Sequence, residues 1–254
     1  MTEEPFSWTM HSFDEVDSTN RWLLDACRNG APSGTVAIAR VQTAGRGRLG
    51  RTWTAPPDSA LLMSVLVRPD SLPTVDTVDQ WHLLTFVLAL AASRAIDQLG
   101  ASTSMKWPND VMAVRPDGEE RKLAGILAQA DHGDQPGIVL GIGVNLERPL
   151  LLPEEVAVRG VWLNELIPET TRPTAKGLAD LLLSELGDVL LTPLPGVLAH
   201  IRQRCITLGR KVRVETSSGD VTGIATAIAD DGALVVETSE TLRTFHAGDV
   251  VHLR

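Results

Sequence analysis

Residues 42–53 have the sequence Gln-Thr-Ala-Gly-Arg-Gly-Arg-Leu-Gly-Arg-Thr-Trp, which places three arginines and three glycines between Gly45 and Trp53. Glycine permits positive φ, so a glycine-rich backbone can turn its N–H groups toward one ligand. Arginine adds a planar guanidinium that fits a carboxylate or a phosphate. The stretch predicts an anion-binding loop, although a solvated basic turn or a disordered arginine-glycine patch has the same composition.

The segments on either side of this loop predict β-strands. Residues 35–39 form an apolar run that leads directly into the loop, and residues 61–67 form a second run after it. Residues 18–29 predict a helix that Gly30 ends. Because ligand loops commonly follow strands of a rigid sheet, this order supports a binding role for residues 42–53.

The rest of the chain predicts an α+β fold with a mixed, mostly antiparallel sheet. We expect a long helix at 78–99, four strands between 104 and 144, and mainly helices from 154 to 205. Short strands separated by Ser-Gly and Asp-Gly turns follow, a pattern typical of a small β-barrel. The expected domains are residues 1–207 and 208–254.

Composition limits the classes of function. The chain has 254 residues, 43% of them hydrophobic, and a formal net charge of −9, which argues against a general nucleic-acid binder. The longest apolar window, residues 83–92, is too short to span a membrane. The acidic N-terminus lacks the basic start of a signal peptide, so a cytoplasmic location is expected.

Five segments carry polar or charged side chains that a core strand or an ordinary turn does not need. Simpler roles exist for each, such as helix capping, edge-strand protection or turn formation. These separate structural roles do not explain why all five segments occur together in one chain. The segments are 17–20, 42–53, 106–110, 122–127 and 141–146.

The ordered motifs resemble those of the biotin protein ligases from about residue 14 to the end of the chain. They are Asp-Ser-Thr-Asn, Gln-x-x-Gly-Arg-Gly-Arg-x-Gly-Arg-x-Trp, Lys-Trp-Pro-Asn-Asp, Lys-Leu-Ala-Gly-Ile-Leu and Gly-x-Gly-x-Asn. The resemblance implies a catalytic domain related to class II aminoacyl-tRNA synthetases and lipoate ligases, followed by a Src-homology-3-like barrel. Repressor members carry an N-terminal DNA-binding domain, and because only seventeen residues precede Ser18, the monofunctional type is expected.

The chain departs from the family pattern at two places. Leu49 stands where the loop often has another basic residue, which leaves Arg46, Arg48 and Arg51 in place. Residues 114–121 are longer than a tight hairpin, which makes the alignment of Lys122 less firm than that of the other central residues.

The resemblance also implies roles for individual residues. Expected biotin-binding residues are Ser18, Thr19, Asn20, Gln42, Gly45, Arg46, Gly47, Arg48, Lys122, Gly125, Gly141 and Gly143. Expected ATP-binding residues are Arg48, Arg51, Trp53, Asn109, Lys122 and Asn145. Expected catalytic residues are Arg46, Arg48, Lys122 and Asp110, with Asp110 either holding Mg²⁺ or acting as a base.

The implied reaction has two steps. Biotin and ATP form biotinyl-5′-adenylate, and a lysine of a biotin carboxyl carrier domain then accepts the biotin. The expected partners are biotin, ATP with Mg²⁺, and the carrier domain, without DNA or membrane, in a monomer or weak homodimer. A lipoate ligase of the same fold and a nucleic-acid-binding regulator are the alternatives.

Overall fold

A computed structural model describes residues 7–68, 72, 75, 78–115, 117–216 and 219–253. Glu3 and Glu4 of the acidic N-terminus lie outside this range, as do Pro116 and Ser218 of two expected turns.

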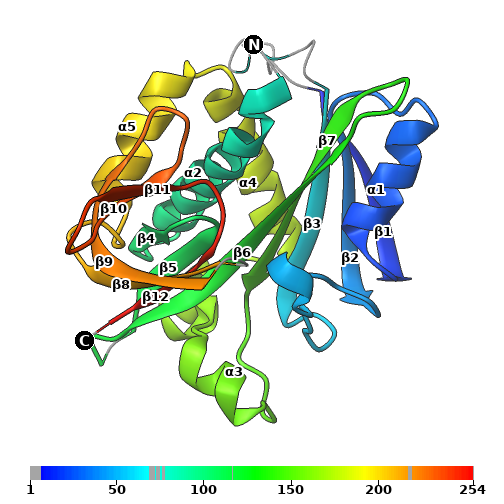
Figure 1. The fold of residues 1–254 in the computed structure, drawn as a ribbon. Coiled ribbons are helices and arrows are strands. Elements are labelled where there is room, and N and C mark those ends of the chain that lie inside the picture. Colours follow the sequence, from blue (N-terminus) through cyan, green and yellow to red (C-terminus); the bar gives the residue numbers. More distant parts are fainter. Residues whose placement is uncertain are drawn as a thin grey trace.

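The larger of two sheets has seven strands in the order β1-β2-β3-β7-β6-β5-β4 (Figure 1). β1 pairs with β2 in parallel, and the remaining neighbours pair antiparallel, as the predicted mixed sheet requires. The strands are β1 (Thr9–Val16), β2 (Thr35–Gln42), β3 (Ala60–Val67), β4 (Thr103–Lys106), β5 (Asp110–Val114), β6 (Glu120–Asp131) and β7 (Gly137–Asn145).

Helices cover both faces of this sheet. Ala37, Leu66 and Val139 pack against α1 (Thr19–Arg28), whereas the alternating neighbours Val36 and Ile138 join the main core. That core includes α2 (Leu84–Gln98), α4 (Ala175–Leu190) and α5 (Leu194–Arg204), which Figure 1 shows on the side away from α1. Burial on both faces explains why the central strands have nearly continuous apolar sequences.

Two expected helical regions are less regular than the sequence patterns predict. Residues 78–83 form the 3-10 segment η3 (Val78–Leu83), and the α-helix begins only at Leu84. The His82 ring lies between the carbonyls of Asp79 and Asp231. The second contact holds this segment against the C-terminal region, and residues 78–83 do not continue the α-helix. Between residues 154 and 174 the helices are short: α3 (Glu154–Arg159), η4 (Leu163–Glu165) and η5 (Glu169–Thr171).

The C-terminal strands form a separate antiparallel sheet of five strands in the order β11-β10-β9-β8-β12. The turn between β9 and β10 contacts the segment between β4 and β5 of the larger sheet, because the indole Nε1 of Trp107 donates to Gly232 O over 3.0 Å. The strands are β8 (Lys211–Thr216), β9 (Gly219–Ile228), β10 (Leu234–Glu237), β11 (Leu242–Phe245) and β12 (Asp249–His252). In the part of the chain that the structure describes, no helix is both long and apolar enough to cross a membrane.

Replacement of Leu88 by alanine tests the central position of α2. Leu88 is 0% exposed, so the cavity left by Leu88→Ala should lower the free energy of unfolding by about 2–5 kcal/mol. Leu191→Ala, at a side chain that is 45% exposed, should change it by less than about 1 kcal/mol. Urea denaturation of both variants provides the measurement, and equal losses would contradict the assignment of α2 to the core.

Candidate functional site

One cavity of about 140 Å³ collects most of the polar residues that the sequence motifs singled out. The cavity lies on the same face of the larger sheet as α1, next to the amino end of that helix. The residues that line it come from α1 and its N-cap, from the end of β2 and the loop after it, from β3, from β5 and the turn before it, and from β6, β7 and β12. They include Ser18, Thr19, Asn20, Gln42, Arg46, Gly47, Arg48, Arg51, Trp53, Asn109, Asp110, Lys122, Gly125, Gly141 and Gly143.

A network of uncharged hydrogen bonds closes one end of the cavity. Ser18 is the N-cap of α1, with extended backbone at φ −160°. The next backbone N–H, that of Thr19, donates to Gln42 Oε1 over 2.8 Å, and the Thr19 hydroxyl lies 2.6 Å from Ser64 Oγ. Ser64 is 0% exposed and donates to Asn20 Oδ1 over 2.6 Å. This end therefore presents hydroxyl and amide groups and no charge.

Three glycines form the floor. Gly125 on β6 pairs with Gly143 on β7, and Gly141 lies on the same face two residues before Gly143. A Cβ at Gly141 would collide with Asn20 Oδ1, and one at Gly143 would collide with the Trp53 ring. The absence of side chains at these positions allows groups to approach the backbone closely.

The Trp53 ring lies on this floor. Its Nε1 is buried and has no hydrogen-bond partner among the described residues. Small-molecule sites commonly enclose about 300–1,000 Å³. The cavity is smaller because the indole fills space between Gly125 and Gly143.

A β-bulge brings Lys122 to the same face as the glycines. Val111 pairs with Ala124, but the next residue of β5, Met112, pairs with Lys122, so Leu123 is the extra residue. Simple alternation would place residues 122 and 125 on opposite faces of a strand. Because of the bulge, Lys122 and Gly125 lie on the same face of the sheet. Bulges commonly redirect a side chain in this way.

Cationic side chains occupy the other end of the cavity. Lys122 Nζ lies 2.6 Å from Asp110 Oδ1 and 5.6 Å from the centroid of the Trp53 ring. Arg48 donates to Asn109 Oδ1 over 3.2 Å. Burial lowers the pKa of the Arg48 guanidinium, an effect that the nearby Asp110 and Asp249 oppose. A partly desolvated guanidinium that donates to an amide oxygen is suited to exchange this contact for an anionic ligand.

The arginine-glycine loop is folded on itself. Gly47 N donates to Arg51 O over 2.7 Å, and Trp53 N donates to Gly45 O over 3.0 Å. Leu49 has φ 54°, a left-handed conformation that is uncommon for a residue with a side chain. Several backbone N–H groups are thus engaged within the loop, and Arg46, Arg48 and Arg51 are among the residues that line the cavity.

Two predicted site residues do not line the cavity. Gly45 packs closely against the backbone of Trp53, because a Cβ at this position would collide with Trp53 O. Asn145 donates from Nδ2 to Lys122 O over 3.3 Å and to Val161 O over 3.1 Å. The amide of Asn145 therefore holds the backbone beneath Lys122.

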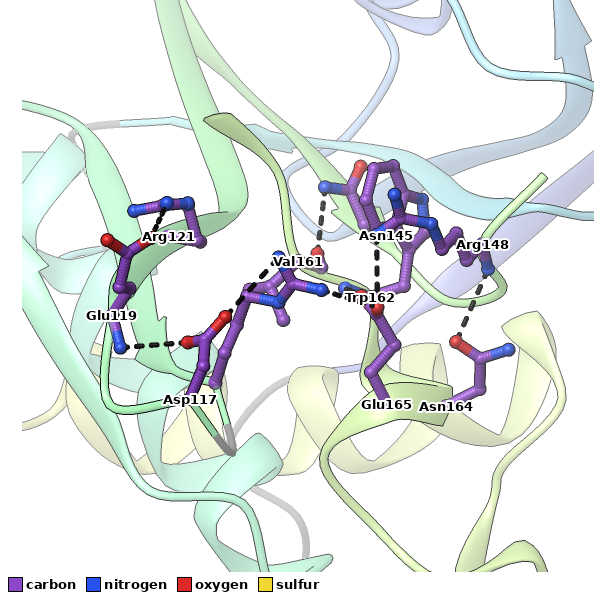
Figure 2. Close-up of polar contacts among 10 residues, drawn as sticks. Asp117, Glu119, Arg121, Asn145, Arg148, Val161, Trp162, Asn164 and Glu165 are labelled. Atoms are coloured by element: carbon purple, nitrogen blue, oxygen red, sulfur yellow. Dashed lines mark hydrogen bonds and ion pairs between the residues drawn. The ribbon is translucent and has the colours of Figure 1, made fainter. Parts of the chain in front are cut away.

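Figure 2 shows the polar cluster around Asn145. The Arg148 guanidinium stacks on the Trp162 ring at 4.9 Å and pairs with Glu165 at 3.0 Å. Glu165 also accepts from the backbone N–H of Trp162 over 3.0 Å. These contacts anchor the segment that follows β7 next to the cavity.

The sequence motifs missed several residues of the lining. Ser64 has a signal, because it is the one polar residue in the apolar run 61–67. Asp249 has none, because β12 is remote in sequence; its carboxylate pairs with Arg51 and raises the pKa of that guanidinium through their hydrogen bond. The other lining residues outside the predicted set are Leu49, Thr52, Met63, Ile126, Leu127 and Ile142.

His252 of β12 contacts the segment that precedes β8. Arg210 donates to His252 Nδ1 over 3.4 Å, and Nε2 lies 3.3 Å from Thr207 Oγ1. Burial, followed by the positive charges of Lys106 and Arg210, lowers the pKa of His252 from 6.5 to about 4, and Glu120 opposes this shift. The imidazole is therefore neutral at pH 7, which allows Nδ1 to accept from Arg210.

Comparisons with known proteins agree with this geometry. The model of the biotin/lipoate A/B protein ligase family matches residues 12–145, and that of the biotin protein ligase C-terminal domain matches residues 207–253. The biotin–[acetyl-CoA-carboxylase] ligase of Mycobacterium tuberculosis is 39% identical over 94% of this chain and 87% of its own length. This chain belongs to the biotin protein ligase family.

Other relatives extend the comparison. The bifunctional ligase/repressor BirA of Escherichia coli is 31% identical over 92% of this chain and 71% of its own length. The biotin protein ligase of Aquifex aeolicus, solved in complex with biotin and ATP, superposes with a TM-score of 0.76 at 26% identity and covers 97% of this chain and 99% of its own. The expected α+β ligase fold with a mixed sheet is confirmed, and a separate antiparallel sheet of five strands stands where the small C-terminal barrel is expected.

Replacement of Asn145 by alanine distinguishes a supporting role from a nucleotide contact. Asn145→Ala should lower the free energy of unfolding by about 1–3 kcal/mol, because the carbonyls of Lys122 and Val161 lose a donor. Asn29→Ala, at an exposed amide that bonds only to Asp25 O, provides the control in urea denaturation. Unchanged stability with a raised KM for ATP would instead favour the nucleotide contact that the family motif implies.

The depressed pKa of His252 predicts a pH dependence of stability. Between about pH 6.5 and pH 4 the unfolded chain binds a proton at this site that the folded chain does not, so stability should fall as the pH falls through this window. His252→Gln should flatten that part of the curve, and His200→Gln, at an exposed helical position, should not. Denaturant midpoints at a series of pH values test this, and identical slopes for all three proteins would contradict it.

Proposed function

We propose that this chain is an ATP-dependent biotin protein ligase. It joins biotin and ATP into biotinyl-5′-adenylate with release of pyrophosphate, and then transfers biotin to a lysine of a biotin carboxyl carrier domain. One observation carries the proposal: a single cavity has an uncharged polar end, a glycine floor and a cationic end, in that order. The named activities of the relatives, among them the ligases of M. tuberculosis and A. aeolicus, support it.

The uncharged end suits the ureido ring of biotin. A cyclic urea carries N–H donors and a carbonyl acceptor, and the hydroxyls of Ser18 and Thr19 and the amide of Gln42 are able to match both. The valeryl tail would lie over Gly141 and Gly143 beside Leu127. The biotin carboxylate would then reach the end that contains Lys122.

The cationic end suits adenylate formation. A carboxylate must approach the α-phosphorus of a polyanion, so the repulsion between them has to be offset. The cavity is lined by four cationic side chains, Arg46, Arg48, Arg51 and Lys122, and by two carboxylates. In the proposed step a biotin carboxylate oxygen bonds to the α-phosphorus, the bond to the β-phosphate breaks, and pyrophosphate leaves with the electron pair.

Two further residues of the cavity lining would contact ATP. Trp53 offers a flat face for adenine, and Asn109 offers an amide to the nucleotide's polar edge. Trp53 must leave its place on the glycine floor for the biotin tail to occupy that space. The unpartnered Nε1 of Trp53 removes one obstacle to this movement, because no hydrogen bond has to break.

The acidic residues of the cavity suit a magnesium ion that the protein and the phosphates of ATP would bind together. Among the described residues no cluster of three acidic, histidine or cysteine ligands exists, so a complete protein cage is not formed. Mg²⁺ usually takes one or two carboxylates and completes its shell with water and substrate phosphates. Asp110 would supply such a carboxylate, and the ion would neutralise phosphate charge.

The second half-reaction needs a base. The carrier lysine is protonated in water, and its amine must lose a proton to attack the biotinyl carbonyl. Asp110 lines the cavity beside Lys122, and in the alternative to holding Mg²⁺ its carboxylate would accept that proton while AMP departs.

The sister activity, lipoate ligation, fits the polar end less well. A dithiolane ring has no hydrogen-bonding groups equivalent to a urea, so the buried hydroxyls and amides would lose partners. No feature of the site favours a nucleic-acid regulator. Lack of DNA binding, the monomeric or weakly dimeric state, and a cytoplasmic location, where ATP is available, stay predictions.

Biotin-dependent exchange of labelled pyrophosphate into ATP tests the first half-reaction. We expect exchange with biotin and not with lipoate, and a loss of at least about 100-fold in Lys122→Ala, because an oriented cation at a developing charge contributes on that scale. Lys211→Ala, at an exposed lysine of β8, should keep full exchange.

Transfer of biotin from isolated adenylate to a carrier domain tests the second half-reaction by mass spectrometry. Exchange supported only by lipoate would move the protein to the lipoate ligases. Absence of exchange with either acid would refute the adenylating activity.

A further inference from the structure

The larger sheet has two edge strands, and the structure covers only one of them. The outer side of β4 contacts the segment that follows α5, because Ile206 N donates to Met105 O over 2.9 Å and Met105 forms a bridge with Cys205. At the other edge, β1 pairs with β2 and with no other strand of the described residues. Figure 1 shows β1 at this margin of the sheet. An edge strand of this kind presents backbone N–H and C=O groups to a further strand.

The β1 edge lacks the features that commonly keep edge strands from pairing with other chains. Natural edge strands are often very short, bulged, or protected by proline or lysine. β1 is eight residues long, contains neither proline nor lysine, and pairs with β2 in one continuous register. It also carries a half-buried aromatic ring, that of Phe13, whose centroid lies 5.0 Å from that of Trp22. The edge is therefore suited to the addition of a strand.

The side chains of β1 alternate between the two faces of the sheet. His11 and Phe13 lie on the face that carries α1, where both rings contact Trp22. Asp14 lies on the opposite face and pairs with Arg40 of β2 over 3.3 Å. The exposed residues of β1 thus form two sets, one on each face, and a partner strand has to match both.

A second copy of β1 matches both sets when it is added antiparallel about a two-fold axis through Phe13. On the α1 face, His11 then lies opposite Glu15 of the second copy, this pair occurs twice, and the two Phe13 rings meet at the axis. On the other face, Ser12 lies opposite Asp14 of the second copy, again twice. Opposite residues of an antiparallel pair have Cβ atoms about 4.5–5.5 Å apart, which brings an imidazole or a hydroxyl within reach of the carboxylate.

The neighbouring registers are less favourable. An axis through Asp14 would place the two Asp14 carboxylates opposite each other, and like charges in that position destabilise a strand pair. An axis through Ser12 would place Asp14 opposite the apolar Met10. Of these three registers, only the one centred on Phe13 brings every charged side chain of β1 opposite a group that can hydrogen-bond to it.

We infer that the outer edge of β1 is a homodimer interface, at which a second copy of this chain adds its own β1 antiparallel with Phe13 at the two-fold axis. This inference does not rest on the proposed function. The axis is perpendicular to the sheet, so each face continues across the interface and both cavities lie on the same face. Because the core of α1 packs over β2, β3 and β7, the helix leaves the outer side of β1 open.

Sedimentation velocity of the full chain tests the interface. One pair of strands is a small interface, so wild-type protein should change from monomer to dimer between about 1 and 200 µM. His11→Glu, at an exposed residue, should raise the dissociation constant at least about tenfold, because it places like charges opposite each other twice. Thr244→Glu is the matched control: it adds the same charge at an exposed residue of β11, the edge strand of the second sheet, and should leave the constant unchanged.

A double variant tests the register. His11→Glu combined with Glu15→His exchanges the two members of the pair and keeps the composition of the chain. Association should return to within about threefold of wild type, because a carboxylate and an imidazole again lie opposite each other. Both substituted residues are exposed, and urea midpoints of the dilute proteins check that the monomer fold is unchanged.

Each outcome supports or overturns the inference. Wild-type protein that stays monomeric over the whole range would overturn it, and so would a dimer that His11→Glu does not weaken or that Thr244→Glu does. Failure of the double variant to restore association would refute the register centred on Phe13. None of these measurements requires biotin or ATP, so the interface and the proposed function succeed or fail separately.

Discussion

The cavity depends on three cross-strand positions that carry no side chain. Gly125, Gly141 and Gly143 lie on the face of the sheet that packs against α1 at Leu66 and Val139. Farther along the same strands the apolar side chains end and the glycines begin, so the layer that α1 fills gives way to a cavity that the Trp53 ring partly occupies. The amino end of α1 then places Ser18, Thr19 and Asn20 at the wall of that space.

The second constraint is electrostatic. A chain with a net charge of −9 gathers four cationic side chains around one cavity, where Asp110 and Asp249 hold two of them in ion pairs. The Asp110 pair keeps the partly buried Lys122 from being isolated, Asp249 pairs with the exposed Arg51, and an incoming polyanion can take the place of both carboxylates. Because Asp249 and His252 belong to β12, the C-terminal sheet contributes directly to this end of the site.

Much of the architecture was predictable from local patterns. The strands at 35–39 and 61–67 and the helix after Ser18 follow from apolar runs and an N-cap, and they appear as β2, β3 and α1. The start of α2 was not predictable, because residues 78–83 have a helical pattern but are tied through His82 to a turn of the C-terminal sheet. A contact with a residue that is distant in sequence does not change the local sequence pattern.

The sequence by itself indicated most of the residues that line the cavity, because motifs that resemble those of the biotin protein ligases contain them. The tertiary structure alone decided how they are directed. Lys122 faces the glycines only because Leu123 is an extra residue in the pairing of β6 with β5. Ser64 and Asp249 join the site through strand register and through the packing of the second sheet, which bring together residues too far apart in the chain for any local pattern to relate.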